Sequence, residues 1–195
     1  MTTKTTTEDP IKAIVRVFTE KGDSEYGGES VNQREHALQA AACALRDGAD
    51  DPLVVAALLH DLGHMLHELP DDAPDEGIDD AHEVTAARKL APWFDLDVTE
   101  PVRLHVDAKR YLTGSDPGYM AILSEPSVTS LMLQGGPMDA AAQEEFRQNP
   151  HWEAAVRLRR WDDEAKVPNA ETPTVDEFIP LIRGVLRPEF RRGTA

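Results

Sequence analysis

The sequence predicts an all-α protein, and three observations support this fold class. Apolar residues recur at helical spacing along most of the chain, as in Ile11, Ile14, Val15 and Phe18. Proline or a capping residue marks the start of most of these segments, and glycine often follows their end. No stretch shows the alternation of apolar and polar residues that is typical of a half-buried strand. We therefore predict a single-domain helical bundle.

The length and the local composition indicate one domain. At 195 residues the chain can bury one sizeable core, and it contains no internal repeat. We predict one domain over residues 1–195, with its core at about residues 10–188 and flexible tails at residues 1–9 and 189–195. No apolar stretch approaches the ~20 residues of a membrane span, and the first residues do not resemble a signal peptide. The expected location is the cytoplasm, with no membrane partner.

The charge and the cysteine content narrow the classes of function. A formal net charge of −16 argues against nucleic acid as a partner and against binding to anionic membranes. An anionic small molecule stays compatible with this charge, because a metal centre and a few cations can make one pocket locally positive. The single cysteine, Cys43, excludes an internal disulfide. It lies in an alanine-rich segment, where we interpret it as a small buried residue and not as a nucleophile.

The N-terminal part of the chain predicts two helices joined by a glycine-containing loop. Residues 10–20 have helical apolar spacing and are followed by Gly22. The loop contains Tyr26-Gly27-Gly28-Glu29, which by itself could be only a flexible linker. Residues 31–46 form the second predicted helix, which carries His36. A lone histidine on such a face is more often a core residue than a ligand, so its role stays open at this point.

Residues 53–67 are predicted to form a central, buried helix. Asp51-Pro52 provides a cap and a proline at the first helical position, and the segment is apolar nearly all round until it reaches His60-Asp61. A buried carboxylate next to an imidazole is costly unless it is paired or binds a metal. The pair therefore either forms hydrogen bonds across the core or binds metal together with ligands from other helices.

The segment after this helix is acidic and is followed by another predicted helix. Residues 68–80 contain two prolines and a glycine, so we predict a solvated loop with a possible role as a lid. We interpret its charges as a contribution to solubility. Residues 81–90 form the next predicted helix, with His82 in its first turn, where a histidine can face either a site or solvent.

Residues 99–112 are predicted to be helical, with a proline in the first turn. His105 and Lys109 are four residues apart and share a face of this helix. A cation beside a metal-bound histidine is repelled unless an anion joins them. The spacing therefore indicates an anionic ligand.

The C-terminal part of the sequence predicts four more helices. Three of them have a start signal: a serine with a proline for the first, an aspartate for the second, and a capping box at Thr174 for the last. The third of the four helices contains Arg159 together with Asp162 and Asp163. An ion pair between Arg159 and Asp162 on the helix surface is the simplest interpretation of this spacing. The four segments are residues 126–134, 139–148, 151–166 and 174–186.

Histidines and aspartates on these helices suit one or two metal ions better than a thiolate zinc site. Spacing alone does not exclude His64, His67 or His151 from the set, and it does not choose between iron, manganese and zinc. The candidate ligands are His36, His60, Asp61, His82, His105 and one of Asp162 and Asp163.

The order of these ligands resembles the HD-domain superfamily, in which a first histidine, a His-Asp pair and a late aspartate hold the metal. Two further histidines mark the branch that binds two metals. Within that branch, five runs between residues 26 and 166 are similar to the PhnZ-type organophosphonate oxygenases, which are mixed-valent di-iron relatives of inositol oxygenase. Two of these runs, Lys109-Arg110-Tyr111-Leu112 and Gln134-Gly135-Gly136-Pro137-Met138, are specific, whereas the His-Asp pair also occurs in phosphohydrolases.

The resemblance implies two iron ions, Fe²⁺ and Fe³⁺, with O₂ as co-substrate. It implies cleavage of the carbon–phosphorus bond in a 1-hydroxy-2-(amino or trimethylammonio)ethylphosphonate, which gives phosphate and glycine or glycine betaine. It also implies functional pairing with a separate hydroxylase that makes the 1-hydroxyphosphonate. By the same resemblance Asp61 bridges the irons; one iron is completed by His36, His60 and Asp162, and the other by His82 and His105.

The resemblance also implies a substrate pocket beside the irons. Tyr26 resembles a residue that occupies an iron position before substrate arrives, and Glu29 resembles one that moves with it. Cations from two different helices would receive the phosphonate, with a neutral hydrogen bond from a serine. The predicted substrate-binding residues are Lys109, Arg159, Ser127, His64 and Gln33.

Two other functions remain compatible with the sequence. An HD-type phosphohydrolase would use the same ligands to activate water on a phosphate ester. A metal-containing protein that binds a ligand without turnover is the second alternative. Consumption of O₂ by the iron-loaded protein separates the oxygenase from both.

Overall fold

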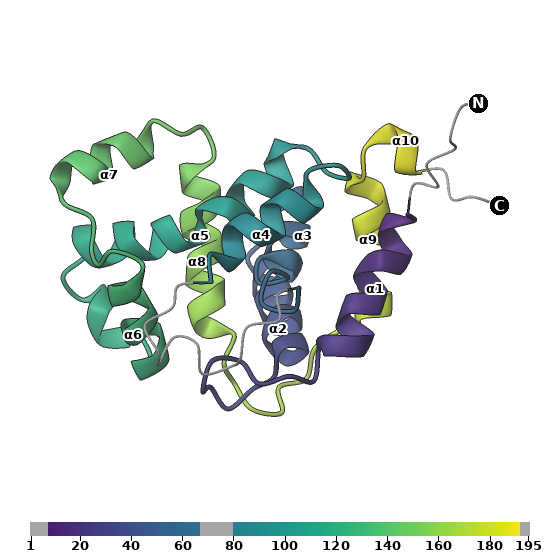
Figure 1. Ribbon diagram of the computed structural model, residues 1–195, viewed down its shortest axis with the longest axis horizontal. Helices are drawn as coiled ribbons and strands as arrows, with labels where there is room; N and C mark the ends of the chain where they lie inside the picture. The colour runs from purple at the N-terminus through teal and green to yellow at the C-terminus, as the bar shows by residue number, and fades with distance from the viewer. Residues whose placement is uncertain (1–7, 67–79, 192–195) are drawn as a thin grey trace.

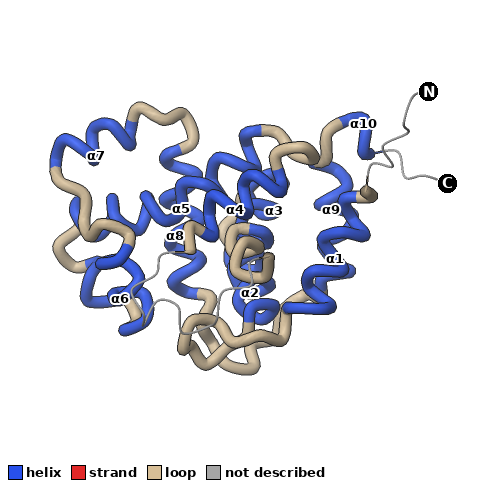
Figure 2. The backbone as a smooth tube through the Cα atoms, in the orientation of Figure 1, coloured by secondary structure: helices blue, strands red, loops and turns tan. Residues whose placement is uncertain are grey.

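The computed structural model describes residues 8–66 and 80–191, and the predicted all-α fold class is confirmed (Figure 1). Within these ranges the chain forms helices and two isolated β-bridges but no strand (Figure 2). The elements are α1 (Pro10–Lys21), α2 (Gln33–Arg46), α3 (Asp51–Leu59), α4 (His82–Leu90), α5 (Leu96–Ser115), η1 (Tyr119–Ile122), α6 (Glu125–Leu133), α7 (Ala140–Arg147), α8 (Trp152–Glu164), α9 (Val175–Val185) and α10 (Pro188–Arg191).

Side-chain caps fix where most helices begin. The Ser124 hydroxyl, for example, accepts a hydrogen bond from the amide of Ser127 at the start of α6. The predicted capping box at Thr174 is confirmed, since the Glu177 carboxylate accepts from the Thr174 amide at 2.7 Å. The short elements η1 and α10 were not predicted. The α10 helix, Pro188–Arg191, overlaps the first residues of the segment predicted as a C-terminal tail.

The central helix is shorter than the predicted 53–67 segment. It ends at Leu59, and residues 60–66 form successive turns in which an amide bonds the carbonyl three residues earlier, as from His64 to Asp61 at 3.0 Å. Gly63 permits this path, because a Cβ there would lie 2.0 Å from the His82 carbonyl oxygen. The tight contact between the turns and the start of α4 therefore prevents the helix from continuing.

The position of α3 in the centre is as predicted. Every residue from Leu53 to Leu59 is buried, and the helix packs against α2, α5, α8 and α9. The main core surrounds it, and Cys43 packs against that core, where burial raises the pKa of its thiol. A second, smaller core lies where α5, α7 and α8 meet.

Different sets of helices form the two ends of the bundle (Figure 1). Helices α6 and α7 lie at one end and α1, α9 and α10 at the other, with α2, α3, α4, α5 and α8 between them (Figure 1). No helix in the described part of the chain is both long enough and apolar enough to cross a bilayer.

Candidate metal centre and substrate pocket

Six predicted ligands converge in the middle of the bundle. They come from α2, from the turns after α3, and from α4, α5 and α8, so five segments of the chain contribute. All six side chains are buried, none more than 6% exposed. They are His36, His60, Asp61, His82, His105 and Asp162.

Asp61 lies between two pairs of histidines. Its Oδ2 atom is 3.4 Å from His36 Nε2 and 3.3 Å from His60 Nε2. Its Oδ1 atom is 3.3 Å from both His82 Nε2 and His105 Nε2. Within each pair the two Nε2 atoms are 3.1 Å apart. Each carboxylate oxygen therefore faces its own pair of imidazoles.

Asp162 completes the first pair. Its carboxylate oxygens lie 3.4 Å from His36 Nε2 and 3.8 Å from His60 Nε2. The donor atoms of these two histidines and of Asp61 and Asp162 all lie within 4.8 Å of one another. The neighbouring residue, Asp163, faces Arg159 and Tyr119 instead. Of the two aspartates left open by the sequence, Asp162 is the one placed at the centre.

The hydrogen bonds of the imidazoles prepare them to bind cations. The Nδ1–H groups of His36, His60 and His105 donate to the carbonyl oxygens of Ala165, Ala57 and Val102 at 2.7 to 2.9 Å. The Nδ1–H of His82 donates to Asp80 Oδ1 at 2.8 Å. These bonds leave each Nε2 lone pair for a ligand at the centre of the cluster.

Asp61 provides an independent test of this interpretation. Its Oδ1 atom is buried and has no hydrogen-bond partner among the described residues. Burial by itself would raise the pKa of Asp61, but His60, His105 and His36 hold that pKa well below its usual range. An ionised, buried oxygen with this environment fits a metal ion. The donor set of imidazoles and carboxylates suits iron, manganese or zinc.

His60 carries a proton that a metal would have to displace. Burial lowers the pKa of His60, but Asp61 and Asp162 outweigh burial and raise it to about 10. Metal binding at this position is therefore linked to release of a proton.

Comparisons with known proteins identify the family. The sequence profile of the HD domain matches residues 34–143. A hydroxymethylphosphonate dioxygenase of Gimesia maris is 44% identical over 169 residues, which is 86% of this chain and 84% of the relative. The glycine-betaine-forming (1-hydroxy-2-(trimethylamino)ethyl)phosphonate dioxygenase of Leisingera caerulea is 40% identical over 173 residues, or 89% of this chain and 88% of the relative.

The chain belongs to the HD-domain phosphonate dioxygenases. A protein of Acanthamoeba polyphaga mimivirus, named uncharacterized protein L432, is also 33% identical over 175 residues. The HD profile ends at residue 143, before α8 begins. The last candidate ligand of this HD-domain protein, Asp162, thus comes from a segment outside the profile match.

Tyr26 lies against the cluster, as predicted. Its ring stacks on His36 with centroids 3.8 Å apart, and its hydroxyl donates to Asp162 Oδ1 at 3.3 Å. Burial, together with the charges of Asp162 and Asp61, raises the pKa of Tyr26 well above its usual value. The phenol therefore keeps its proton and covers one side of the centre.

Lys109 and Arg159 are both buried, and each has a partner. Lys109 Nζ donates to Ser130 Oγ at 2.9 Å, and burial and the charge of Arg159 lower its pKa to about 7. Arg159 forms ion pairs with Asp162, at 2.7 Å, and with Asp163. The ion pair predicted as the simplest interpretation of Arg159 therefore exists, but it is buried and not on the surface.

Glu29 belongs to a cluster that the sequence did not reveal. Lys166 Nζ donates to Glu29 Oε1 at 2.8 Å, to Ser127 Oγ at 2.9 Å and to Ser124 Oγ at 3.0 Å. Ser124 also donates to Glu29. These bonds fasten the Tyr26-Gly27-Gly28-Glu29 loop to α6 and to the end of α8. Lys166 comes two residues after α8, so no helical spacing linked it to the ligands.

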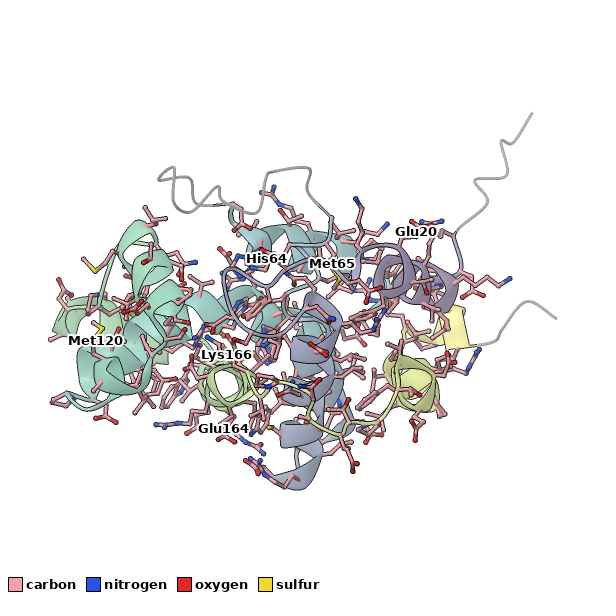
Figure 3. All side chains as sticks on the ribbon, turned by 90° about the horizontal axis from the view of Figure 1, so that it is seen from below. Glu20, His64, Met65, Met120, Glu164 and Lys166 are labelled. Carbon is pink, nitrogen blue, oxygen red and sulfur yellow. The ribbon has the colours of Figure 1, made fainter. Side chains whose placement is uncertain are left out.

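His64 lies beside both His82 and Tyr26, and its ring centroid is 6.3 Å from that of Tyr26. Its ring stacks on His82 with centroids 3.8 Å apart, and its Nδ1 atom is 2.7 Å from Asp80 Oδ2. Asp61, His64 and His82 form a second group that could hold a metal. Figure 3 places His64 and Lys166 in the middle part of the molecule, between its two ends. His64 thus packs against the candidate ligand His82 and is held by Asp80.

The contacts of Asp80 show that the charges of the acidic segment do not serve solubility alone. Its carboxylate holds both His64 and His82, so its charge does more than aid solubility. These contacts shift the pKa of Asp80 far below its usual value, although burial opposes the shift. The other residues of the predicted lid, and His67, lie outside the described part of the chain.

Gln33 and His151 are the remaining candidates from the sequence. Gln33 is buried, and its side-chain amide donates to the Glu25 carbonyl at 3.1 Å, so it supports the loop. His151 is partly exposed and lies 3.9 Å from Asp97. The structure therefore does not bring His151 to the centre.

Proposed function

We propose that this protein is an O₂-dependent oxygenase that cleaves the carbon–phosphorus bond of a 1-hydroxyphosphonate. The position of Asp61, with one pair of imidazoles facing each carboxylate oxygen, is the observation that carries the proposal. This arrangement suits two adjacent cations bridged by one carboxylate. Similarity to two phosphonate dioxygenases supports the choice of reaction.

The overall reaction balances without a further reductant. The C1 carbon, which carries one hydrogen, a hydroxyl and the phosphonate, is oxidised to a carboxylate while O₂ is reduced. The C–P bond breaks, phosphorus leaves as inorganic phosphate, and one proton is released. One oxygen atom of O₂ is needed for the carboxylate and the other for phosphate, so no water is consumed.

We propose two iron ions as the cofactor, Fe²⁺ and Fe³⁺, bridged by Asp61. One would be held also by His36, His60 and Asp162, and the other by His82 and His105. When bound, such a pair supplies Lewis acidity for the substrate oxygens and electrons for O₂. The protein residues keep the site dry and fix the imidazole tautomers through their Nδ1 bonds.

The chain's own cations give the pocket its preference for an anion. Lys109 and Arg159 would bind the phosphonate oxygens, and Ser127 would add a neutral hydrogen bond. Tyr26 would leave the centre when the substrate enters, and the Glu29 loop would move with it. Gln33 and His64 would line the part of the pocket nearest to that loop.

We retain both head groups as candidates, a 2-amino and a 2-trimethylammonio group. The products would then be phosphate and glycine or glycine betaine, and a separate hydroxylase would supply the 1-hydroxyphosphonate. Glu29 is already paired with Lys166, so a cationic head group would compete with that lysine. Hydroxymethylphosphonate, which has no cation, belongs in every substrate panel for this reason.

The test is phosphate release by the iron-loaded protein, measured with and without O₂ on the three hydroxyphosphonates and on phosphate esters. We expect release from at least one hydroxyphosphonate, with matching O₂ consumption and no release under anaerobic conditions. Release from an ester without O₂ would instead establish the phosphohydrolase alternative. Absence of turnover on the whole panel, despite full iron loading, would favour a binding protein.

A further inference from the structure

Arg159 is held by an ordered set of acceptors in the interior of the protein. Its Nη1 atom lies 2.7 Å from Asp162 Oδ2 in an ion pair, and its Nε atom donates to Asp163 Oδ2 at 3.2 Å. Its Nη2 atom donates to Asp163 Oδ1. The residue is only 4% exposed. The guanidinium plane is therefore fixed along two edges by carboxylates three and four residues further along α8.

The two hydrogen bonds to Asp163 use two of the five N–H groups of the guanidinium. The other three belong to Nη1 and Nη2 and lie on the edges of the group that do not face Asp163. Lys109 is also buried, and it lies on α5, which packs against α8. Two neighbouring buried cations, each with donors to spare, are suited to a doubly charged anion placed between them.

The orientation of Arg159 depends on Asp163, and Asp163 has a further partner. The Tyr119 hydroxyl donates to Asp163 Oδ2, the oxygen that also receives Arg159 Nε. Tyr119 is only 2% exposed and comes from η1, the short element between α5 and α6. Burial and the charge of Asp163 raise the pKa of Tyr119, so its hydroxyl keeps the proton that it donates. Tyr119 in η1 thus affects Arg159 indirectly, because both side chains donate to the carboxylate of Asp163.

We propose that Asp163 and Tyr119 are positioning residues that orient Arg159 toward the anionic group of the substrate. Neither residue would touch substrate or metal; Tyr119 was not among the predicted site residues, and Asp163 was considered only as an alternative metal ligand to Asp162. The proposal rests on the proposed function for the identity of the anion, because the two buried cations by themselves indicate only that the bound group is anionic. Asp162 would then hold a metal on one side and Arg159 on the other.

Tyr119→Phe is the main test, because it removes one hydroxyl and keeps the buried ring. The metal-loaded variant is compared with the wild type for KM and kcat on the hydroxyphosphonate that is turned over. The dissociation constant of inorganic phosphate is measured by calorimetry, which needs no turnover. We expect both KM and the phosphate dissociation constant to rise about fivefold or more, with kcat changed by less than about twofold and metal content unchanged.

Asp163→Asn should have the larger effect, about tenfold or more on both constants, since Arg159 then loses one of its two charged partners, the one that holds its Nε and Nη2 groups. Asp163→Glu should restore part of the loss. Tyr111→Phe is the matched control, because its hydroxyl contacts Arg147 at 3.5 Å in the second core, away from Arg159. It should leave both constants unchanged.

A purely structural role gives a different pattern. If Tyr119→Phe lowers the melting temperature while KM and the phosphate dissociation constant match those of Tyr111→Phe, the proposal is wrong. Loss of metal in Tyr119→Phe would also overturn it. If no hydroxyphosphonate is turned over, the proposed function fails, but weaker phosphate binding by the variant would still support the positioning role.

Discussion

Asp162 and Asp163 are adjacent in sequence but have different partners. Asp162 faces His36 and His60, whereas Asp163 faces Arg159 and Tyr119. We predict that Asp162→Ala lowers the bound metal by at least one ion per chain and abolishes activity. Asp163→Ala should keep its metal, because it removes no ligand. Metal analysis of the purified variants checks this, and the opposite pattern would contradict the assignment of Asp162.

The pKa of Lys109 leads to a prediction about pH. Burial and Arg159 lower the pKa to about 7, against the opposing effect of Asp162, Asp163 and Asp61. Above that pH the lysine is neutral in the free protein, so binding of a dianion must take up a proton. Above about pH 8, where phosphate is already a dianion, we predict that its dissociation constant rises by up to about tenfold per pH unit.

Calorimetry at several pH values, in buffers with different ionisation enthalpies, measures both the affinity and the proton uptake. Lys109→Met should bind phosphate more weakly at neutral pH and should show no proton uptake. The pH dependence of folding stability has the opposite sign to that of phosphate binding. Lys109 has a pKa of about 7 in the folded protein, whereas in the unfolded chain it keeps its proton up to its normal, higher pKa. The folded protein therefore gains stability relative to the unfolded chain as the pH rises above about 7. Proton uptake that persists in Lys109→Met would assign it to another group.

The sequence predicted which histidines and aspartates lie together better than it predicted the residues that hold them in place. His36, His82 and His105 could be placed because their order relative to the His60-Asp61 pair is characteristic, and helical spacing gives the face on which each lies. Lys166 and Asp80 could not be placed, because each follows or precedes a helix and its direction is set by tertiary contacts. No local pattern encodes the distance of such a residue from the centre.

The helix that precedes the His-Asp pair, α3, shows a similar limit for an element. Its start was predicted from Asp51-Pro52, but its end was not, because no proline follows and the apolar run continues. The end at Leu59 depends on a contact with His82, which lies on the far side of the acidic segment. Gly63 is the only sign of that contact in the local sequence, and a single glycine inside an apolar run is a weak signal of a helix end.

Gly63 itself supports a prediction about the turns after α3. An added methyl group would lie 2.0 Å from the His82 carbonyl oxygen, so Gly63→Ala must push the start of α4 away. His82 would move with it and lose its position opposite Asp61. We predict destabilisation by about 1–3 kcal/mol and reduced metal binding, with the His82 and His105 position affected first.

Denaturant unfolding and metal titration test this prediction together. Gly184→Ala, in α9, is the matched control, because a Cβ there has no atom within 4 Å. It should keep full metal binding and should be neutral or stabilising by up to about 1 kcal/mol. Normal metal binding in Gly63→Ala would show that the backbone contact with His82 does not position the ligand.

For the whole molecule, the ligand cluster connects segments that are far apart in the chain. A metal that binds only the folded state stabilises it by about 2.7 kcal/mol when its concentration is one hundred times the dissociation constant. For a chain of this size that stabilisation raises the melting temperature by about 5–10 °C. We predict a rise of this order on adding Fe²⁺ to the metal-free protein under anaerobic conditions. Scanning calorimetry measures it.

Asp61→Ala is the decisive comparison for that rise. It removes the one carboxylate that both histidine pairs face, so the melting temperature of the variant should respond little to metal. The melting temperature of metal-free Asp61→Ala is the baseline for the variant, and it can differ from the melting temperature of the metal-free wild type. An equal rise in both proteins would place the stabilising metal somewhere other than between the histidine pairs.

The convergence of five segments on Asp61 also bears on how such a chain can diversify. Active sites commonly lower stability, so evolution trades one against the other. Here a bound cation would crosslink the bundle, and substitutions at the ligands would then harm folding and activity together. The pocket wall formed by α6, which packs mainly against α5, is under less constraint. New substrate preferences can therefore arise on that wall while the ligands stay fixed, which agrees with two relatives of different named substrates.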